Sequence, residues 1–201
     1  MGSEPGLEQR FLSLILENPF NREILARLPR LGLADLWLVS GCLFQTAWNV
    51  LDGRDPCYGI KDYDLFYFDA DLSWEAENRA IKRAAAIFSE LPIELELRNQ
   101  ARVHLWYEQK FGVPCDVFKS SCEGIDHFLN TFSMVGAQPA GPDLRLYAPC
   151  GLRDVFERVM RPNPLWRGSS RRERYEEKAA RWKSLWPDLH VEPWDVHCTS
   201  P

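Results

Sequence analysis

Two aspartates separated by one residue, at the beginning of a strongly apolar segment, constrain this chain more than any other feature. The segment is Asp62-Tyr63-Asp64-Leu65-Phe66-Tyr67-Phe68, which predicts a buried β-strand. Side chains alternate faces along a strand, so Asp62 and Asp64 point to the same side, about 6.5–7 Å apart. Isolated buried carboxylates are costly unless a cation pairs with them. A hard divalent cation, Mg²⁺ or Mn²⁺, suits these oxygen ligands.

A glycine turn lies upstream of the two aspartates. Residues 35–40 are predicted to form a strand, Gly41 a turn, and the residues from Cys42 onwards a helix. Glycine lets the backbone approach a ligand closely. The free N–H groups at a helix start attract phosphate. The backbone of Ser40, Gly41 and Cys42 is therefore a candidate phosphate site.

The order of strand, glycine turn, helix and Asp-x-Asp strand resembles the nucleotidyltransferase superfamily typified by DNA polymerase beta. Three further motifs follow in order: Asn-Gln-Ala-Arg-Val-His at 99–104, Ala-Pro-Cys-Gly-Leu-Arg-Asp-Val-Phe at 148–156, and Arg-Pro-Asn-Pro at 161–164. Together they resemble a family of small, mostly bacterial nucleotidyltransferase-like proteins whose acceptor is uncharacterised. The resemblance covers the chain from Leu36 to Leu189.

The resemblance implies an enzyme that transfers NMP from an NTP to an acceptor by a two-metal mechanism. Asp62 and Asp64 would bind the catalytic Mg²⁺ (or Mn²⁺), and the turn at Gly41 would hold the triphosphate. Cys42 stands where the superfamily usually has Gly or Ser, which removes a hydroxyl but leaves the backbone amides available. The acceptor is left open as a small molecule, RNA or protein. Two other functions also stay open, a nucleotide-binding regulatory protein without turnover and a metal-dependent phosphohydrolase.

The third carboxylate of such a site should come from the adjacent strand, about 4.8 Å away. Glu94 and Glu96 face one way on that strand, and the resemblance aligns Glu96 with the third metal ligand. Alternating Ile, Glu and Leu is also the pattern of any half-exposed strand. Asp116, in the apparent strand 115–118, is the alternative.

Further nucleotide contacts are expected from polar side chains beyond the third acid. Asn99 or Gln100 is expected at a ribose or base edge, Arg102 at the triphosphate oxygens, and Arg161 and Lys178 at the site from the C-terminal part of the chain. Buried amides that pair with backbone, and a helix-capping role for the 161–164 motif, are the structural alternatives. Cations concentrate near the C-terminus, either towards the site or as a solvated helix face: Arg161, Arg167, Arg171, Arg172, Arg174, Lys178, Arg181 and Lys183.

The predicted fold is α/β (α+β), a mixed central sheet flanked by helices in a single domain of 201 residues. An N-terminal helical segment covers 1–34, the catalytic core 35–148 and a C-terminal helical segment 149–201. Helices are expected over 7–28 with a break at Pro19, 74–90 after an N-cap at Ser73, 123–130, 151–160 and 170–186. A strand is expected over 93–104, a loop over 108–114 and a hairpin over 134–147.

The composition excludes several classes of protein. A net charge of −5 argues against broad attraction to nucleic acid. The chain has no apolar run that could span a bilayer and no signal-peptide pattern. Its six cysteines form no Cys-x-x-Cys pair, which favours reduced thiols over a disulfide frame or a zinc site. These features predict a cytoplasmic protein that does not associate with membranes.

Overall fold

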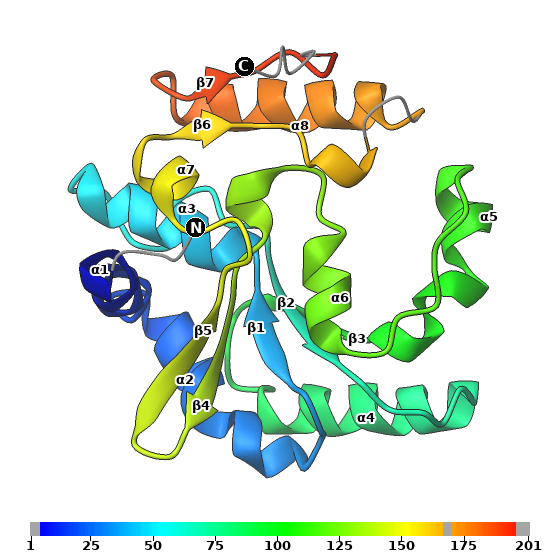
Figure 1. Ribbon diagram of the computed structural model, residues 1–201. Helices are drawn as coiled ribbons and strands as arrows, with labels where there is room; N and C mark the ends of the chain where they lie inside the picture. The colour runs from blue at the N-terminus through cyan, green and yellow to red at the C-terminus, as the bar shows by residue number, and fades with distance from the viewer. Residues whose placement is uncertain (1–4, 167–169, 196–201) are drawn as a thin grey trace.

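The central sheet is mixed and is flanked by helices, as predicted from the sequence (Figure 1). The computed structural model describes residues 5–166 and 170–195. The sheet order is β3-β2-β1-β4-β5, and only β2 and β3 run parallel. Its strands are β1 (Trp37–Val39), β2 (Asp62–Tyr67), β3 (Glu94–Asn99), β4 (Gly136–Ala140) and β5 (Asp143–Tyr147).

Helices surround this sheet, and a small parallel pair of strands accompanies the last of them. The α-helices are α1 (Pro5–Ile15), α2 (Pro19–Arg27), α3 (Gly41–Leu51), α4 (Trp74–Ile87), α5 (Tyr107–Phe111), α6 (Ser121–Asp126), α7 (Arg153–Phe156) and α8 (Arg172–Leu185). The 3₁₀ helices are η1 (Leu28–Leu31), η2 (Gln100–Leu105), η3 (Thr131–Ser133) and η4 (Pro164–Trp166), and the strand pair is β6 (Val159–Met160) with β7 (His190–Val191).

A buried asparagine joins α2 to α3 and β2. The Asn18 Oδ1 accepts hydrogen bonds from two backbone N–H groups in the first turn of α2, at 2.9 and 3.3 Å. Its Nδ2 donates to Thr46 Oγ1 at 3.0 Å and to Tyr63 Oη at 3.1 Å. Because Tyr63 lies between Asp62 and Asp64, this helix cap also anchors the strand that carries the two acids.

Five aromatic side chains fix α8 against α3. Trp182 and Trp186 of α8 pack on Phe44 and Trp48 of α3, each pair with ring centroids 5.3 Å apart. Phe132 of η3 completes the cluster, 4.7 Å from Phe44 and 4.9 Å from Trp48. The packing holds α8 across the end of the sheet where β1 finishes and α3 begins (Figure 1).

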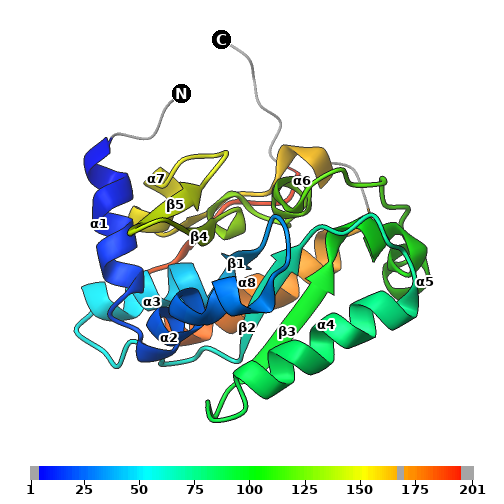
Figure 2. The same cartoon turned by 90° about the horizontal axis from the view of Figure 1, so that it is seen from below.

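The two faces of β3 serve different purposes. Leu95 and Leu97 lie against α4, which runs alongside the strand in Figure 2. Glu96 and Arg98 point to the other face, where they line a cleft that α8 also borders. The period-2 alternation of side chains along a strand therefore separates an apolar side from a charged one.

The predicted strand over 93–104 is too long, because β3 ends at Asn99. The Asn99 Oδ1 accepts a hydrogen bond from the Ala101 N–H at 3.1 Å and caps η2, which follows at once. A local bond from an Asn side chain to the backbone competes with the strand ladder and ends it.

Two neighbouring expectations are also wrong. Residues 107–111 form α5 where a loop was expected, and 115–118 have no regular structure where a strand was expected.

The predicted helix over 151–160 is reduced to α7, because Arg158 adopts a left-handed φ of 53°. Its guanidinium pairs with Asp52 and Asp188, which holds that unusual backbone in place.

The cysteines agree with the expectation of reduced thiols. Cys42, Cys57, Cys115, Cys122 and Cys150 are free, whereas Cys198 and the predicted cation Arg167 lie outside the described residues. Across residues 5–166 and 170–195, no helix combines the length and apolar character that crossing a membrane requires.

Asn18→Ala should destabilise the protein by about 2–3 kcal/mol. The change removes an N-cap and leaves the buried Tyr63 hydroxyl without a partner from Asn18. Ser73→Ala is the matched control, because Ser73 also caps a helix but through one bond at the surface, and it should cost about 1 kcal/mol. Urea unfolding followed by circular dichroism measures both, and equal losses would contradict the role assigned to Asn18.

Candidate active site

A cleft of about 580 Å³ opens between the sheet, α5 and α8. Side chains from the ends of three sheet strands and from α8 meet in it. Those that the sequence singled out and that line the cleft are Ser40, Gly41, Asp62, Asp64, Glu96 and Lys178.

Three carboxylates share this cleft. Asp64 is the register partner of Glu96 across the parallel β2–β3 pair, and Asp62 precedes Asp64 on the same face. Burial, then the neighbouring charges of Asp62 and Glu96, raise the pKa of Asp64 to about 7. Lys178 and Arg98 act in the opposite direction. The charges of Asp62 and Glu96 thus add to the effect of burial at Asp64, and Lys178 and Arg98 offset them only in part.

The structure separates the two candidates for the third acid. Glu96 lines the cleft, and its Oε2 forms an ion pair with Arg98 Nη2 at 3.1 Å. Asp116 is exposed in the segment before α6 and does not line the cleft.

The donor chemistry of the cleft suits a hard cation, because all three candidate ligands are carboxylates. Over the described part of the chain, however, no three His, Cys, Asp or Glu side chains are arranged closely enough to hold a metal ion. One Glu96 oxygen instead pairs with a cation of the protein itself, Arg98.

The turn before α3 combines a strained backbone with N–H groups that have no acceptor within the helix. Ser40 has φ 58° and ψ −114°, a conformation that non-glycine residues rarely adopt. The N–H groups of Leu43 and Phe44 donate to the Ser40 carbonyl at 3.0 and 3.2 Å. Those of Gly41 and Cys42, at the start of α3, have no intrahelical acceptor. A methyl group at Gly41 would lie 2.9 Å from Gln45 Nε2, so this turn is crowded as well.

The Cys42 thiol points away from the cleft. The side chain is fully buried, and its Sγ donates to the Val39 carbonyl at 3.6 Å. Burial, followed by the charges of Asp64 and Asp62, raises the pKa of the thiol. Cys42 is not among the residues that line the cleft, unlike its neighbours Ser40 and Gly41.

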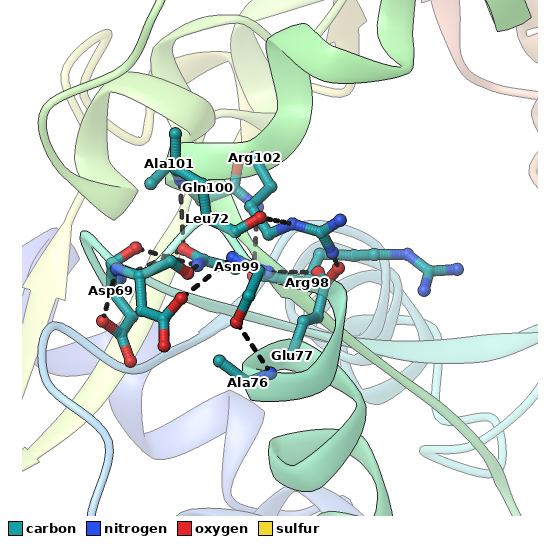
Figure 3. A network of polar contacts seen from close by, with 11 residues as sticks. Asp69, Leu72, Ala76, Glu77, Arg98, Asn99, Gln100, Ala101 and Arg102 are labelled. Carbon is teal, nitrogen blue, oxygen red and sulfur yellow. Dashed lines mark hydrogen bonds and ion pairs between the residues drawn. The ribbon is translucent and has the colours of Figure 1, made fainter.

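Asn99 and Arg102 belong to a network outside the cleft (Figure 3). The Asn99 Nδ2 donates to the Asp69 carbonyl at 2.8 Å, and the Asn99 N–H donates to Glu77 Oε1 at 2.9 Å. Arg102 Nε donates to the Leu72 carbonyl at 2.9 Å, and its Nη1 pairs with the Glu77 carboxylate. In contrast to the predicted nucleotide contacts, both side chains tie the end of β3 to the start of α4.

Arg161 also lies outside the cleft. Its guanidinium pairs with Asp154, with an N–O distance of 3.2 Å, and with Glu192. The neighbouring Asn163 is buried and donates to the carbonyls of Asp126 and Phe128, both at 2.7 Å. The 161–164 motif is thus used to fasten the C-terminal segment, a structural role that differs from the helix cap considered as its alternative.

Lys178 lies in the cleft with three further cations, for which the sequence left open a position towards the site or on a solvated helix face. Burial lowers the pKa of Lys178, and Arg174 lowers it further, whereas Asp64 and Asp62 raise it. The other cleft-lining cations are Arg171, which is the N-cap of α8, and Arg174 and Arg181 within the helix. Spacings of three and four residues place all four on one helix face, a signal present in the sequence.

Comparisons with known proteins place this geometry in a family. A model of a nucleotidyltransferase family matches residues 26–191. One solved structure, described as an NMR structure that reveals a CCA-adding enzyme head domain, is 26% identical with a TM-score of 0.74. The similarity covers 92% of this chain and 95% of that one. A search of curated proteins found no match.

Without divalent cations, stability should fall as the pH rises from about 4 to about 7. The pKa of Asp64 is about 7 in the folded protein and near 3.8 in the unfolded chain. Over that range the native state therefore keeps a proton that the unfolded chain has released. The loss is about 4 kcal/mol at most.

Asp64→Asn should flatten this part of the stability profile and make the protein more stable than the parent at pH 8. Urea unfolding in EDTA at several pH values measures the effect. Asp116→Asn is the control, since Asp116 is exposed, and it should keep the parent's slope. A slope between pH 4 and 7 that Asp64→Asn leaves unchanged would contradict the assigned pKa.

Proposed function

The chain belongs to the nucleotidyltransferase family, and we propose that it transfers NMP from an NTP to an acceptor within the cleft described above. One observation supports the proposal most. The carboxylates of Asp62 and Asp64 line the same cleft as the Gly41 turn, so a metal-binding group and a phosphate-binding group face one space. An NTP needs both, because its triphosphate and the cations that accompany it bind together.

Asp62 and Asp64 would hold Mg²⁺ or Mn²⁺, with Glu96 as the third ligand. When bound, the cations activate the attacking group of the acceptor and stabilise the leaving pyrophosphate. The protein's own part is to hold the carboxylates in one cleft although burial and their mutual repulsion oppose their charge, and both effects raise the pKa of Asp64. Arg98 offsets some of that repulsion through Glu96 until the cation arrives.

The triphosphate would lie at the start of α3. Gly41 lines the cleft there, its N–H has no intrahelical acceptor, and the helix dipole favours negative charge at this end. Lys178 faces the same region from α8, because its pKa responds to the charges of Asp64 and Asp62. A largely desolvated ammonium interacts strongly with phosphate oxygens.

Asp62→Asn, Asp64→Asn and Glu96→Gln should each weaken Mg²⁺-dependent NTP binding at least ten-fold. Each change removes one anionic ligand while keeping the size of the side chain. Isothermal titration of each variant with Mg²⁺ and a non-hydrolysable NTP measures the effect, and Asp116→Asn serves as the exposed control. If Asp116→Asn loses binding and Glu96→Gln keeps it, the third ligand is Asp116. Unchanged affinity in both aspartate variants of β2 would remove these acids from the site.

Turnover is tested by following an α-phosphate-labelled NTP with the parent and with Asp64→Asn. Label that becomes attached to an added acceptor in the presence of the parent supports transfer. Free labelled NMP formed without any acceptor would instead indicate a phosphohydrolase. Binding of the NTP without either product, across small hydroxyl compounds, RNA and protein acceptors, would indicate a binding protein without turnover.

Gly41→Val should reduce NTP affinity at least ten-fold, whereas Cys42→Ser should keep or improve it. A valine side chain occupies the space through which the phosphate approaches the backbone, and the neighbouring Gln45 side chain can shift to let the protein fold. The Cys42 side chain is buried away from the cleft, so its exchange leaves the backbone donors in place. Equal NTP affinity of folded Gly41→Val and the parent would contradict the proposed triphosphate position.

A further inference from the structure

Arg171 is a buried cation with unused hydrogen-bond donors. Its side chain lines the cleft although the residue is only 5% exposed. Within the described part of the chain, its Nε and Nη2 have no hydrogen-bond partner. Buried arginines are normally paired with carboxylates, because desolvating an unpaired charge is costly. The unpaired donors therefore call for an anionic partner that the described residues do not supply.

The rings beside Arg171 hold its guanidinium in position. The guanidinium carbon lies 3.3 Å from the ring centroid of Trp166 and 4.6 Å from that of Tyr107. Rings that contact the guanidinium stabilise the cation and leave Nε and Nη2 without a hydrogen-bond partner among the described residues. Nε and Nη2 remain available as a pair of donors, the arrangement with which arginine binds phosphate or carboxylate bidentately.

Two more cations line the same end of the cleft. Arg174, one turn along α8, lies 4.5 Å from the ring centroid of Phe111 in α5. Lys110 of α5 also lines the cleft, and its ammonium lies 5.3 Å from the same ring. Neither forms an ion pair with a described carboxylate. This end of the cleft, formed by α5 and the start of α8, is therefore basic and aromatic.

The basic end is separate from the carboxylates. Burial lowers the pKa of Lys178, and the charges of Asp64 and Asp62 oppose that shift. Neither acid is among the charges that act on Arg171, which come from Tyr107, Cys115 and Arg174. Seven residues of helix separate Arg171 from Lys178, which corresponds to about 10 Å. One cleft thus contains an acidic end, suited to a cation with an NTP, and a basic end about two helical turns away.

We propose that Arg171, together with Arg174 and Lys110, forms a second anion subsite that binds a phosphoryl group of the acceptor. The assignment of this ligand as the acceptor rests on the proposed transferase function, because the NTP then occupies the end formed by Gly41, Asp62 and Asp64. An acceptor held at the basic end reaches along α8 towards the NTP. A phosphorylated small molecule and a nucleic acid both offer the same phosphoryl chemistry.

The test is a titration of the full chain with inorganic phosphate, in the presence of Mg²⁺ and a saturating non-hydrolysable NTP. The parent should bind phosphate, and Arg171→Gln should bind it at least ten-fold more weakly. Arg172→Gln is the matched control, because Arg172 is exposed and pairs with Glu176 at 2.7 Å and Asp195 at 2.8 Å. Equal phosphate affinity of Arg171→Gln and Arg172→Gln overturns the subsite.

A second measurement does not depend on the variant folding. The Arg171 Nε–H resonance of the ¹⁵N-labelled parent should shift saturably on adding phosphate, after assignment with Arg171→Lys. A resonance that does not move at saturating phosphate overturns the proposal. Repeating both measurements without the NTP analogue distinguishes a failure of the anion subsite from a failure of the proposed transferase function. Phosphate binding that depends on Arg171 in a protein that binds no NTP supports the subsite and contradicts the transferase function.

Two further ligands distinguish the sources of the phosphoryl group. AMP represents a phosphorylated small molecule, and a six-nucleotide RNA represents a nucleic-acid acceptor. In either case Arg171→Gln should weaken binding at least ten-fold. RNA that binds more tightly than AMP, with the stronger salt dependence of several phosphate contacts, identifies a nucleic-acid acceptor. Equal affinities identify a small phosphorylated acceptor, and affinities that Arg171→Gln leaves unchanged overturn the proposal.

Discussion

The aromatic packing between α3 and α8 is the interaction on which the rest of the structure depends. Phe44, Phe132 and Trp182 pack with every pair of ring centroids within 5.3 Å, and all three are buried. Aromatic side chains contribute large buried areas and prefer specific ring geometries. The contact therefore sets both the position and the rotation of α8. With that helix fixed, its apolar stripe enters the core and its cationic stripe faces the cleft.

The cleft that results has charge of opposite sign along its length. Carboxylates gather where β2 and β3 begin, and burial, together with their repulsion, raises the pKa of Asp64. Cations gather towards the start of α8, where Arg171 is held by rings rather than by an acid. Each end is costly without a ligand, since burial penalises charge. A protein of net charge −5 thus keeps a local basic site without becoming generally basic.

The sequence predicted those parts of the site whose geometry is local. Asp62 and Asp64 share a face because a strand has period two, and Gly41 begins a helix because a glycine turn follows an apolar strand. Arg102 could not be placed this way. Its partner Glu77 lies 25 positions away, and only the fold shows that the pair stabilises α4 and β3. The choice between Asp116 and Glu96 as the third acid likewise depended on the fold, because residues 115–118 form a loop instead of the expected strand.

The distance along the chain between α8 and the residues it covers has a consequence for biosynthesis. A ribosome synthesises Asp62, Asp64 and Glu96 long before Trp182 and Lys178. The emerging protein therefore has an acidic sheet end that α8 does not yet cover. The same late segment fills the gap between Phe44 and Phe132. Completion of the core and completion of the cleft are therefore one event, and a chain interrupted before α8 lacks both. Loss of activity and loss of folding should consequently be inseparable for any damage to the buried aromatic side of this helix, which leaves little opportunity for a half-finished protein to bind nucleotide.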